Sequence, residues 1–156
     1  MVNLAYRGDK SAGGWTSEYH LVKGLRTQAS EIEELIADDD TVILLGHAGN
    51  KLVASINVQR ANGSAYLGMI VTRPDLQGRG VGKGMIAAAE NLARKEWQIR
   101  QSTMTVITAR PELISFYERR GYRRTGKMIP FPVHAGVGDP TTQDLELEYL
   151  EKDLAV

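Results

Sequence analysis

Apolar and polar residues alternate in several short segments of the chain, which is the period of a half-buried β-strand. Leu52–Val58 alternates with its apolar residues on one face, and Thr41–Leu45 precedes it across a glycine-containing turn. Together these two segments predict a β-hairpin. Tyr66–Thr72 follows an Asn-Gly turn and is almost wholly apolar, which predicts a central strand that is covered on both faces.

Other segments follow a helical period. Val81–Trp97 has an apolar stripe and predicts a helix, and a second helix starts at 110–112 with proline in a permitted first-turn position. Apolar residues recur every three positions in Thr16–Arg26, which predicts a helix there as well. Ser30 is the expected N-cap of a short helix that ends at three aspartates, with Glu33 as its capping-box partner.

The order of these elements indicates the fold class. Further strands are predicted at Thr103–Thr108, Tyr122–Thr125 and Leu145–Leu150, and a proline-rich loop at Pro130–Pro140. From Thr41 on, the order is strand, strand, strand, helix, strand, helix, strand, strand, which is typical of a mixed α/β sheet with hairpins and crossovers. The chain of 156 residues has no repeat and no long linker, so we expect a single domain over 1–156.

The composition narrows the class of protein. An apolar fraction of 42% and a charged fraction of 24% are ordinary for a globular domain. The chain has no cysteine, which excludes disulfides, cysteine-bound zinc and a catalytic thiol of its own. No apolar run is long enough to cross a membrane, and no signal peptide is visible at the N-terminus. We therefore expect a cytoplasmic protein without membrane contact.

The charge is neutral overall but unevenly distributed. The chain carries 19 basic and 19 acidic residues, yet residues 73–127 hold twelve Lys and Arg against five Asp and Glu. A local anionic ligand and a solvated basic face both account for this excess.

A glycine-rich loop joins the predicted central strand to its helix. Glycines at 78, 80, 82 and 84 let the backbone curl with its N–H groups pointing one way, toward the free N–H groups of the first helical turn. Arg79 and Lys83 add positive charge, so the loop suits a phosphate or pyrophosphate, although a turn without a ligand would use similar residues. The spacing fits neither a Walker loop nor a dinucleotide fingerprint.

The same loop resembles the signature of the GCN5-related N-acetyltransferase (GNAT) family, which reads Gln or Arg, two residues, Gly, one residue, then Gly or Ala. Gln77, Gly80 and Gly82 match it, and residues 115–122 resemble the Phe-Tyr-x-x-x-Gly-Tyr/Phe segment of the family at the usual distance downstream. The resemblance covers about residues 41–128. It implies an acyl-CoA N-acyltransferase fold, with a mixed, mostly antiparallel twisted sheet flanked by helices.

The resemblance also implies an activity. The enzyme would move the acetyl group of acetyl-CoA, its co-substrate, directly to a primary amine of a small molecule or peptide, with no metal and no nucleic acid. The loop amides would hold the pyrophosphate, and the pantetheine would pair with the end of the central strand, from which the strand at 103–108 must splay apart. The implied cofactor-binding residues are Ile70, Val71, Gln77, Gly78, Arg79, Gly80, Val81, Gly82 and Lys83.

Two alternatives stay open at this stage. One is a non-catalytic acyl-CoA-binding regulatory module, and the other is a different nucleotide-binding α/β protein. The acceptor would be selected by residues 8–26 and 128–144, which carry no diagnostic motif.

Tyr117 is the implied catalytic acid. A phenol with an ordinary pKa of about 10 can hydrogen-bond or protonate a departing thiolate, although Tyr117 also fits a core position. No carboxylate lies on the predicted central strand, where many family members have a basic Glu. Glu18, His134 and Asp139 are candidate bases by residue type alone. Arg110 stands where the family often has Asn, and it would reach the cofactor, contact an acidic acceptor, or be exposed.

The N-terminal part departs from the family pattern. The family usually has a strand and two helices before the hairpin, whereas Val2–Arg7 resembles only the end of the first helix. We therefore expect the first strand to be absent from the sheet. An uncovered edge strand invites pairing with another chain, so we also expect a homodimer.

Overall fold

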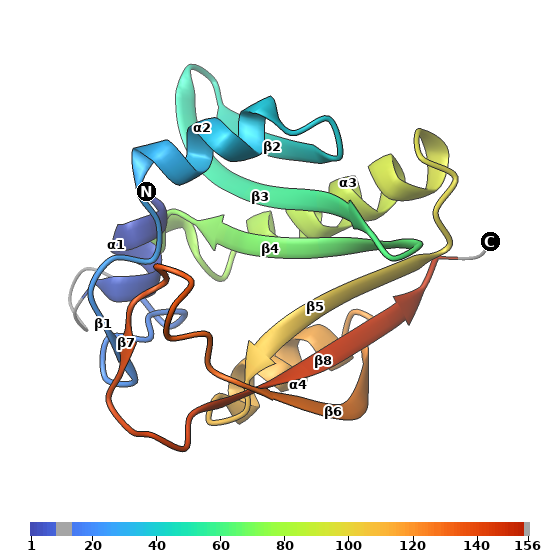
Figure 1. The fold of residues 1–156 in the computed structure, drawn as a ribbon. Helices are drawn as coiled ribbons and strands as arrows, with labels where there is room; N and C mark the ends of the chain where they lie inside the picture. The colour runs from blue at the N-terminus through green and yellow to red at the C-terminus, as the bar shows by residue number, and fades with distance from the viewer. Residues whose placement is uncertain (9–13, 155–156) are drawn as a thin grey trace.

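The computed structural model describes residues 1–8 and 14–154 (Figure 1). The helices are α1 (Val2–Arg7), α2 (Ala29–Ala37), α3 (Val81–Lys95) and α4 (Pro111–Glu118), with a short 3-10 helix, η1, at Pro74–Leu76. The strands are β1 (Val22–Lys23), β2 (Thr41–Ala48), β3 (Lys51–Ala61), β4 (Ser64–Thr72), β5 (Gln101–Ile107), β6 (Arg123–Pro130), β7 (Asp139–Pro140) and β8 (Glu146–Asp153).

Six of the strands form one sheet in the order β2-β3-β4-β5-β8-β6, and β4 lies inside it as the sequence predicts. Neighbouring strands are antiparallel except β4 and β5, which are parallel. The turn before β4 has Asn62 and Gly63 at φ of 51° and 77°, the left-handed geometry that an Asn-Gly hairpin turn requires. The mixed, mostly antiparallel sheet flanked by helices is therefore confirmed.

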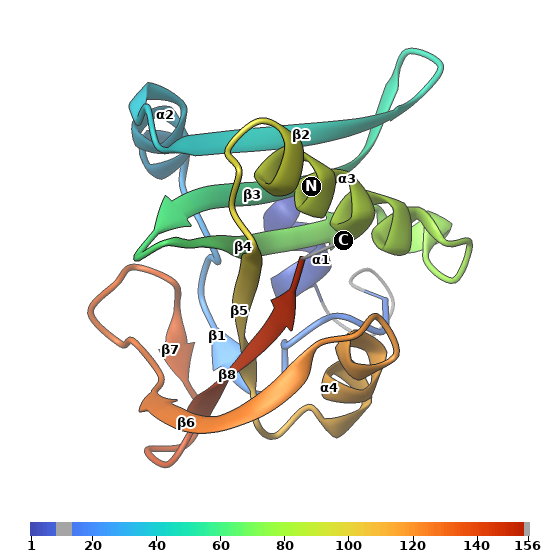
Figure 2. The same cartoon turned by 90° about the vertical axis from the view of Figure 1, so that its right-hand side faces the viewer.

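Helices cover both faces of this sheet (Figure 2). The long helix α3 packs against β3 and β4, while α1 packs against β4 from the other side. The main core includes the buried side chains of Ile56, Leu67, Ile86, Met104 and Leu150. A smaller core, formed by Val22, Ile107, Phe131 and Leu145, joins the two-stranded sheet of β1 and β7 to the end of β5.

The helix predicted at Thr16–Arg26 is wrong. The segment consists of turns and bends around β1, which pairs antiparallel with β7. In a helix, the backbone carbonyl groups of this segment would accept hydrogen bonds from N–H groups of the same helix. Here they accept from distant residues instead: Arg110 donates to the carbonyls of residues 15–17, and the N–H of Thr141 donates to that of Leu21. Gly24, at φ of 85°, adds a backbone conformation that a right-handed helix does not contain.

The N-cap predicted for the short helix is also wrong. Gln28 is the cap, Ser30 lies inside α2, and no side chain hydrogen-bonds the cap. The Thr27 hydroxyl donates to Glu31, so the polar contact at this end lies one turn away from the expected pair. The helix ends at Ala37, directly before the three aspartates, as the sequence predicts.

The edge of the sheet agrees with the expected loss of the first strand. Among the described residues, no strand pairs with β2 on the side away from β3. The side chain of Leu45 on this edge strand is 55% exposed. The homodimer that such an edge invites stays a prediction.

Candidate active site

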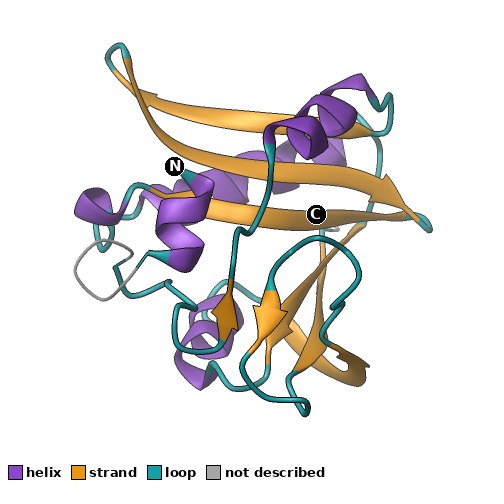
Figure 3. Ribbon diagram, turned by 60° about the vertical axis from the view of Figure 1, so that its left-hand side comes forward, coloured by secondary structure: helices purple, strands orange, loops and turns teal. Residues whose placement is uncertain are grey.

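The strands β4 and β5 separate soon after they begin. Their parallel pairing is limited to Ala65 with Ser102 and Tyr66 with Thr103, and beyond these residues the strands diverge (Figure 1). Figure 3 shows the same separation between the three long strands and the steeper ones below them. The register of β3 and β4 shifts near Met69, whose φ is 45°, so a bulge bends β4 where β5 leaves it. The splay implied by the resemblance is therefore confirmed.

Two cavities open at this split and share Ile70, Leu113 and Tyr117 in their walls. We call the first the loop cavity; it measures about 350 Å³ and is bounded by the glycine-rich loop, the end of β4 and helix α4. We call the second the arginine cavity; it measures about 250 Å³ and contains Arg7 and Arg26 in its wall.

The glycine-rich loop presents bare backbone to the loop cavity. Gly80 is the N-cap of α3 and has no side chain to cap it, so the N–H groups of Val81, Gly82 and Lys83 have no intrahelical acceptor. Gly78 and Gly80 have φ of 77° and 80°, a region that other residues rarely adopt. With no acidic residue in the first turn, this helix end favours an anion.

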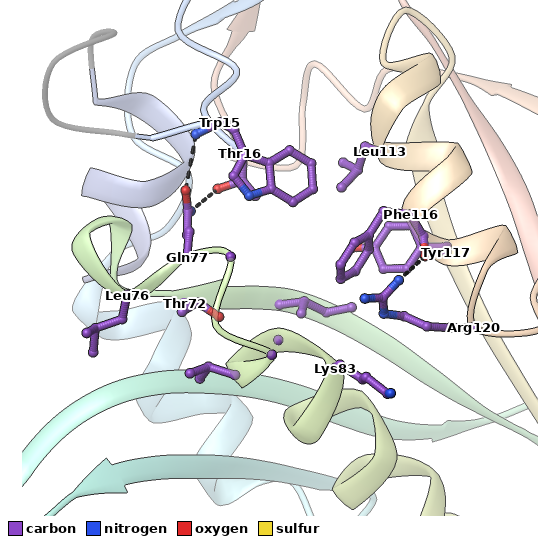
Figure 4. Close-up of a pocket in the computed structure, with 15 residues that line it drawn as sticks. Trp15, Thr16, Thr72, Leu76, Gln77, Lys83, Leu113, Phe116, Tyr117 and Arg120 are labelled. Atoms are coloured by element: carbon purple, nitrogen blue, oxygen red, sulfur yellow. Dashed lines mark hydrogen bonds between the residues drawn. The ribbon is translucent and has the colours of Figure 1, made fainter.

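The Gln77 side chain builds a wall of the same cavity. Its Nε2 donates to the Thr16 hydroxyl at 2.8 Å, and its Oε1 accepts from the N–H of Trp15 at 3.1 Å (Figure 4). These bonds hold the Trp15 segment against the loop. The Trp15 ring then lies 5.6 Å from the ring of Phe116 on α4, so the two aromatic side chains face the cavity together.

Arg110 holds that wall from behind, which corrects each of its expected roles. Its side chain is 3% exposed and lines neither cavity. Nη2 donates to the carbonyl of Trp15 at 2.7 Å, Nη1 to that of Ser17 at 3.1 Å, and Nε to Glu112. Arg110 is therefore a positioning residue, because a fixed guanidinium can bind several carbonyls at once.

Tyr117 lies on α4 where the two cavities meet. Its side chain is buried, with the rings of Phe116 and Tyr122 packed edge-on at 5.3 and 6.2 Å. Among the described residues, its hydroxyl has no hydrogen-bond partner. Burial, with further contributions from Tyr6, Tyr122 and Glu18, raises the pKa of Tyr117 well above its ordinary value. The phenol therefore stays protonated at neutral pH and can donate but not act as a base.

Glu18 is the carboxylate that the fold brings to the arginine cavity. Its side chain is 10% exposed and accepts a hydrogen bond from Arg7 Nη1 at 2.5 Å. Burial raises the pKa of Glu18 above its ordinary value, although Arg7 opposes the shift. The other two candidate bases, His134 and Asp139, are exposed and line neither cavity.

The structure gathers most of the sequence-predicted cofactor residues in the wall of the loop cavity: Ile70, Gln77, Gly78, Gly80, Val81, Gly82 and Lys83. Val71 and Arg79 lie outside it, since Val71 is buried in β4 and Arg79 is exposed to solvent. The carbonyl of Ile70 already accepts a hydrogen bond from the Tyr6 hydroxyl at 3.1 Å. That contact leaves fewer backbone groups of β4 for a pantetheine than the resemblance implies.

Trp15 and Arg120 line the loop cavity but were not expected there. Arg120 lies 3.4 Å from the centre of the Phe116 ring and donates to the Phe116 carbonyl at 2.5 Å, while its buried Nε has no partner. Its position one turn after Phe116 was a usable signal. No sequence pattern placed Trp15, which reaches the cavity through Gln77 and Arg110.

A family model described as an acetyltransferase (GNAT) domain matches residues 17–131. The chain belongs to this family, as its loop and Tyr117 segment led us to expect. No curated protein matches the chain significantly.

Solved structures share the fold. The ribosomal-protein-S18-alanine N-acetyltransferase of Escherichia coli superposes with a TM-score of 0.69 at 13% identity, over 88% of this chain and 83% of that chain. A variant of the spermidine N-acetyltransferase of Vibrio cholerae gives 0.66 at 17% identity, over 87% and 83%. A streptothricin acetyltransferase assigned in Bacillus anthracis, solved with acetyl coenzyme A, gives 0.64 at 24% identity, over 78% and 66%.

Two further findings concern absences. Within residues 1–8 and 14–154, no helix is long and apolar enough to cross a membrane. In the same residues, no three His, Asp or Glu side chains gather as metal ligands would. The expectations of a cytoplasmic, metal-free protein without nucleic-acid contact stay predictions.

Proposed function

We propose that this chain transfers the acetyl group of acetyl-CoA to a primary amine. The observation that carries the proposal is the meeting of two cavities at Tyr117, one beside a helix end suited to an anion and the other beside a buried carboxylate. Acetyl-CoA would supply a thioester whose carbonyl carbon gains a bond to the amine nitrogen while its bond to sulfur breaks.

The residues of the loop cavity fit the co-substrate. The N–H groups of Val81, Gly82 and Lys83 would bind the pyrophosphate, because they have no acceptor within the helix and lie at the positive end of α3. A Cβ built on Gly82 would make ordinary contacts, 3.5 Å from the Thr72 hydroxyl and 3.8 Å from the Phe116 ring, so a larger side chain there would occupy space in the wall of the loop cavity that the anion would use. Lys83 and Arg120 would add positive charge from the cavity wall.

Tyr117 would stabilise the negative charge that develops on the thioester sulfur, and Glu18 would accept the proton of the acceptor ammonium. The Tyr117 hydroxyl, protonated and without a partner among the described residues, would donate a hydrogen bond to the sulfur as it gains negative charge. Glu18 would accept the proton that the ammonium of the acceptor must lose before its nitrogen can attack. A pKa raised by burial makes this carboxylate a stronger base than an exposed one.

The alternative of a non-catalytic acyl-CoA-binding module rested on the lack of a base on the central strand. Glu18 weakens that argument, since it supplies a carboxylate to the same cleft from another part of the chain. Amine-dependent release of the CoA thiol distinguishes the two functions. An enzyme releases thiol in proportion to added amine, whereas a binding module does not.

The loop assignment is tested by a matched pair of variants. Gly82→Val adds a side chain to the wall of the loop cavity, and Gly82 does not have the positive φ that would confound the substitution. Gly84→Val makes the same change two residues later in α3, where a Cβ meets nothing within 4 Å and the residue lines neither cavity. Calorimetry should find acetyl-CoA binding lost in Gly82→Val and kept in Gly84→Val. Equal binding by both variants would contradict the assignment.

A further inference from the structure

The arginine cavity has donor groups without acceptors. Arg7 Nε and Arg26 Nη1 are both buried, and neither has a hydrogen-bond partner within residues 1–8 and 14–154. The side chain of Arg7 is only 7% exposed, and its two terminal nitrogens already bind Glu18 and the carbonyl of Val137. Arg26 is held in place as well, with its guanidinium 5.5 Å from the centre of the Tyr6 ring.

Among the described residues, no neighbouring hydroxyl group accepts a hydrogen bond from these nitrogens. Tyr6 donates to the Ile70 carbonyl at 3.1 Å, and the Tyr66 hydroxyl pairs with that of Thr105 at 2.8 Å. An unsatisfied donor on a buried charged group is costly, and such groups normally meet water, an ion or a ligand. We therefore expect the N–H groups of Arg7 Nε and Arg26 Nη1 to donate to oxygen atoms of a molecule that enters the cavity.

The charged residues in the wall of the arginine cavity indicate which charges that molecule carries. In the part of the chain that the structure describes, the charged side chains of the wall are those of Arg7, Arg26 and Glu18, which together carry one net positive charge. A polyamine would bring several positive charges to this wall and be repelled. A molecule with one ammonium and one carboxylate would match it, with the carboxylate facing the arginines and the ammonium facing Glu18.

The size and polarity of the arginine cavity limit the class of ligand further. The rest of the wall is largely apolar and includes Met104, Val106, Ile107, Phe131 and Leu147. The volume of about 250 Å³ lies below the usual range of about 300–1,000 Å³ for ligand pockets. The cavity therefore suits a small zwitterion with an apolar side chain.

We propose that the acceptor of this enzyme is an α-amino acid with an apolar side chain, whose carboxylate binds Arg26 Nη1 and Arg7 Nε. This inference rests on the proposed acetyl transfer. The α-amine lies between Glu18 and Tyr117. Glu18 takes one proton from the ammonium before the attack, and the amine then loses a second proton to the departing thiolate as the N–C bond forms and the C–S bond breaks. Guanidinium groups are suited to the task because they bind carboxylates with fixed geometry.

The test compares molecules that differ only in the carboxylate. Leucine and 3-methylbutylamine form one pair, and methionine and 3-(methylthio)propylamine form another. Calorimetry on the full chain with CoA present should show the amino acid binding about tenfold to a hundredfold more tightly, the range expected for hydrogen bonds to a charged group. Spermidine should bind more weakly than leucine. Equal binding within each pair, or tighter binding of spermidine, would overturn the inference.

A variant pair locates the effect. Arg26→Met keeps an apolar stem and removes the guanidinium, so it should weaken leucine binding about tenfold or more, whereas binding of 3-methylbutylamine should stay the same or become slightly tighter. Arg60→Met is the control, because Arg60 lies over the Trp97 ring at 5.2 Å, outside both cavities, and should alter neither. If Arg26→Met fails to fold, the wild-type comparison decides alone.

The outcomes separate this inference from the proposed function. Thiol release is followed in parallel with the same amino acids. A binding preference without thiol release would contradict acetyl transfer and support the ligand class. Thiol release with every amine at equal rates and affinities would support acetyl transfer and overturn the amino-acid acceptor.

Discussion

The two cavities that meet at Tyr117 are built in different ways. One continuous stretch, from Gln77 to Lys83, supplies most of the anion-binding part of the loop cavity, largely through backbone groups. The arginine cavity combines side chains from α1, the segments on either side of β1, β4, β5 and the loop after β6. Backbone groups bind any molecule with the right anion, whereas side chains gathered from distant segments can differ between relatives of one fold.

The difference also predicts how each cavity responds to substitution. In the loop cavity, amide groups and the helix dipole share the binding of an anion, so one lysine contributes little. In the arginine cavity, Arg7 and Glu18 are a buried pair, and removing one partner leaves the other charge without compensation. We expect single side chains to matter most at Tyr117 and in the arginine cavity, and least along the loop.

The largest effect on turnover is expected at Tyr117, where the two cavities meet. Tyr117→Phe keeps the ring and removes a hydroxyl that has no partner among the described residues, so the melting temperature and the affinity for acetyl-CoA should change little. Turnover should fall by roughly 10²–10⁴, the usual contribution of a positioned acid. Turnover is measured as the rate of thiol release, and the affinity for acetyl-CoA is measured by calorimetry.

Tyr122→Phe is the control for that substitution. The Tyr122 hydroxyl pairs with Ser102 at 2.7 Å and donates to Glu90 at 3.0 Å, and the residue lines neither cavity. Its loss should cost about 1 kcal/mol of stability or more and leave turnover near normal. If Tyr117→Phe instead keeps more than half of the wild-type rate, Tyr117 is a core residue and has no catalytic role.

Glu18→Gln should lower turnover by at least about 10², because the amide cannot accept the proton of the ammonium. A base acts in its deprotonated form, so the wild-type rate should rise with pH through a pKa that burial holds above the ordinary value of Glu. That rise should vanish in the variant. Rate profiles against pH for both proteins provide the measurement.

Glu148→Gln is the matched control, since Glu148 is also buried and paired, with Arg124 Nη2 at 2.5 Å, but lines neither cavity. Glu18→Gln should lose more stability, because it leaves the buried Arg7 without its charged partner, whereas Arg124 is about half exposed and water can hydrate it. Only Glu18→Gln should lose the dependence of the rate on pH. An unchanged profile in Glu18→Gln would assign the proton to another group.

Arg110→Met should have an intermediate effect on the loop cavity. It releases the carbonyls of residues 15–17, so the Trp15 side of the wall loses its support and the affinity for acetyl-CoA should fall about tenfold. Arg110→Lys, which restores a charge and a donor, should recover part of the affinity. A loss of stability with unchanged affinity would make Arg110 a structural residue only.

Lys83→Ala should have the smallest effect. A single exposed pair is worth about 1 kcal/mol or less, so the affinity for acetyl-CoA should fall a few-fold and depend less on salt. Arg79→Ala makes the same change of charge outside the wall of the loop cavity and should alter the affinity less. A larger effect at Arg79 would move the anion site away from the cavity.

Much of the sheet and of the loop cavity could be predicted from the sequence, because both depend on neighbours along the chain. Alternation identified the hairpin, an almost wholly apolar run identified β4, and the glycines at 78, 80 and 82 marked the start of α3. The family segment around Tyr117 placed that side chain at the split. These signals are local, so they can be seen without knowing the fold.

The arginine cavity and the Trp15 wall could not be predicted in the same way. Arg110 binds the carbonyl of Trp15 across 95 residues, and Arg7 binds that of Val137 across 130, so no window of sequence contains both partners. Those tertiary bonds also account for the wrong helix at Thr16–Arg26, where side-chain periodicity was present but the carbonyl groups were used elsewhere. Residue type suggested Glu18 as a base, and only the fold separates it from His134 and Asp139.

The most direct test of the central claim is a crystal structure of this protein with CoA. We expect the pyrophosphate to lie on the N–H groups of Val81, Gly82 and Lys83, and the sulfur to lie within hydrogen-bond distance of the Tyr117 hydroxyl, at the mouth of the arginine cavity. A complex with CoA bound elsewhere, or with its sulfur far from Tyr117, would contradict acetyl transfer at this junction.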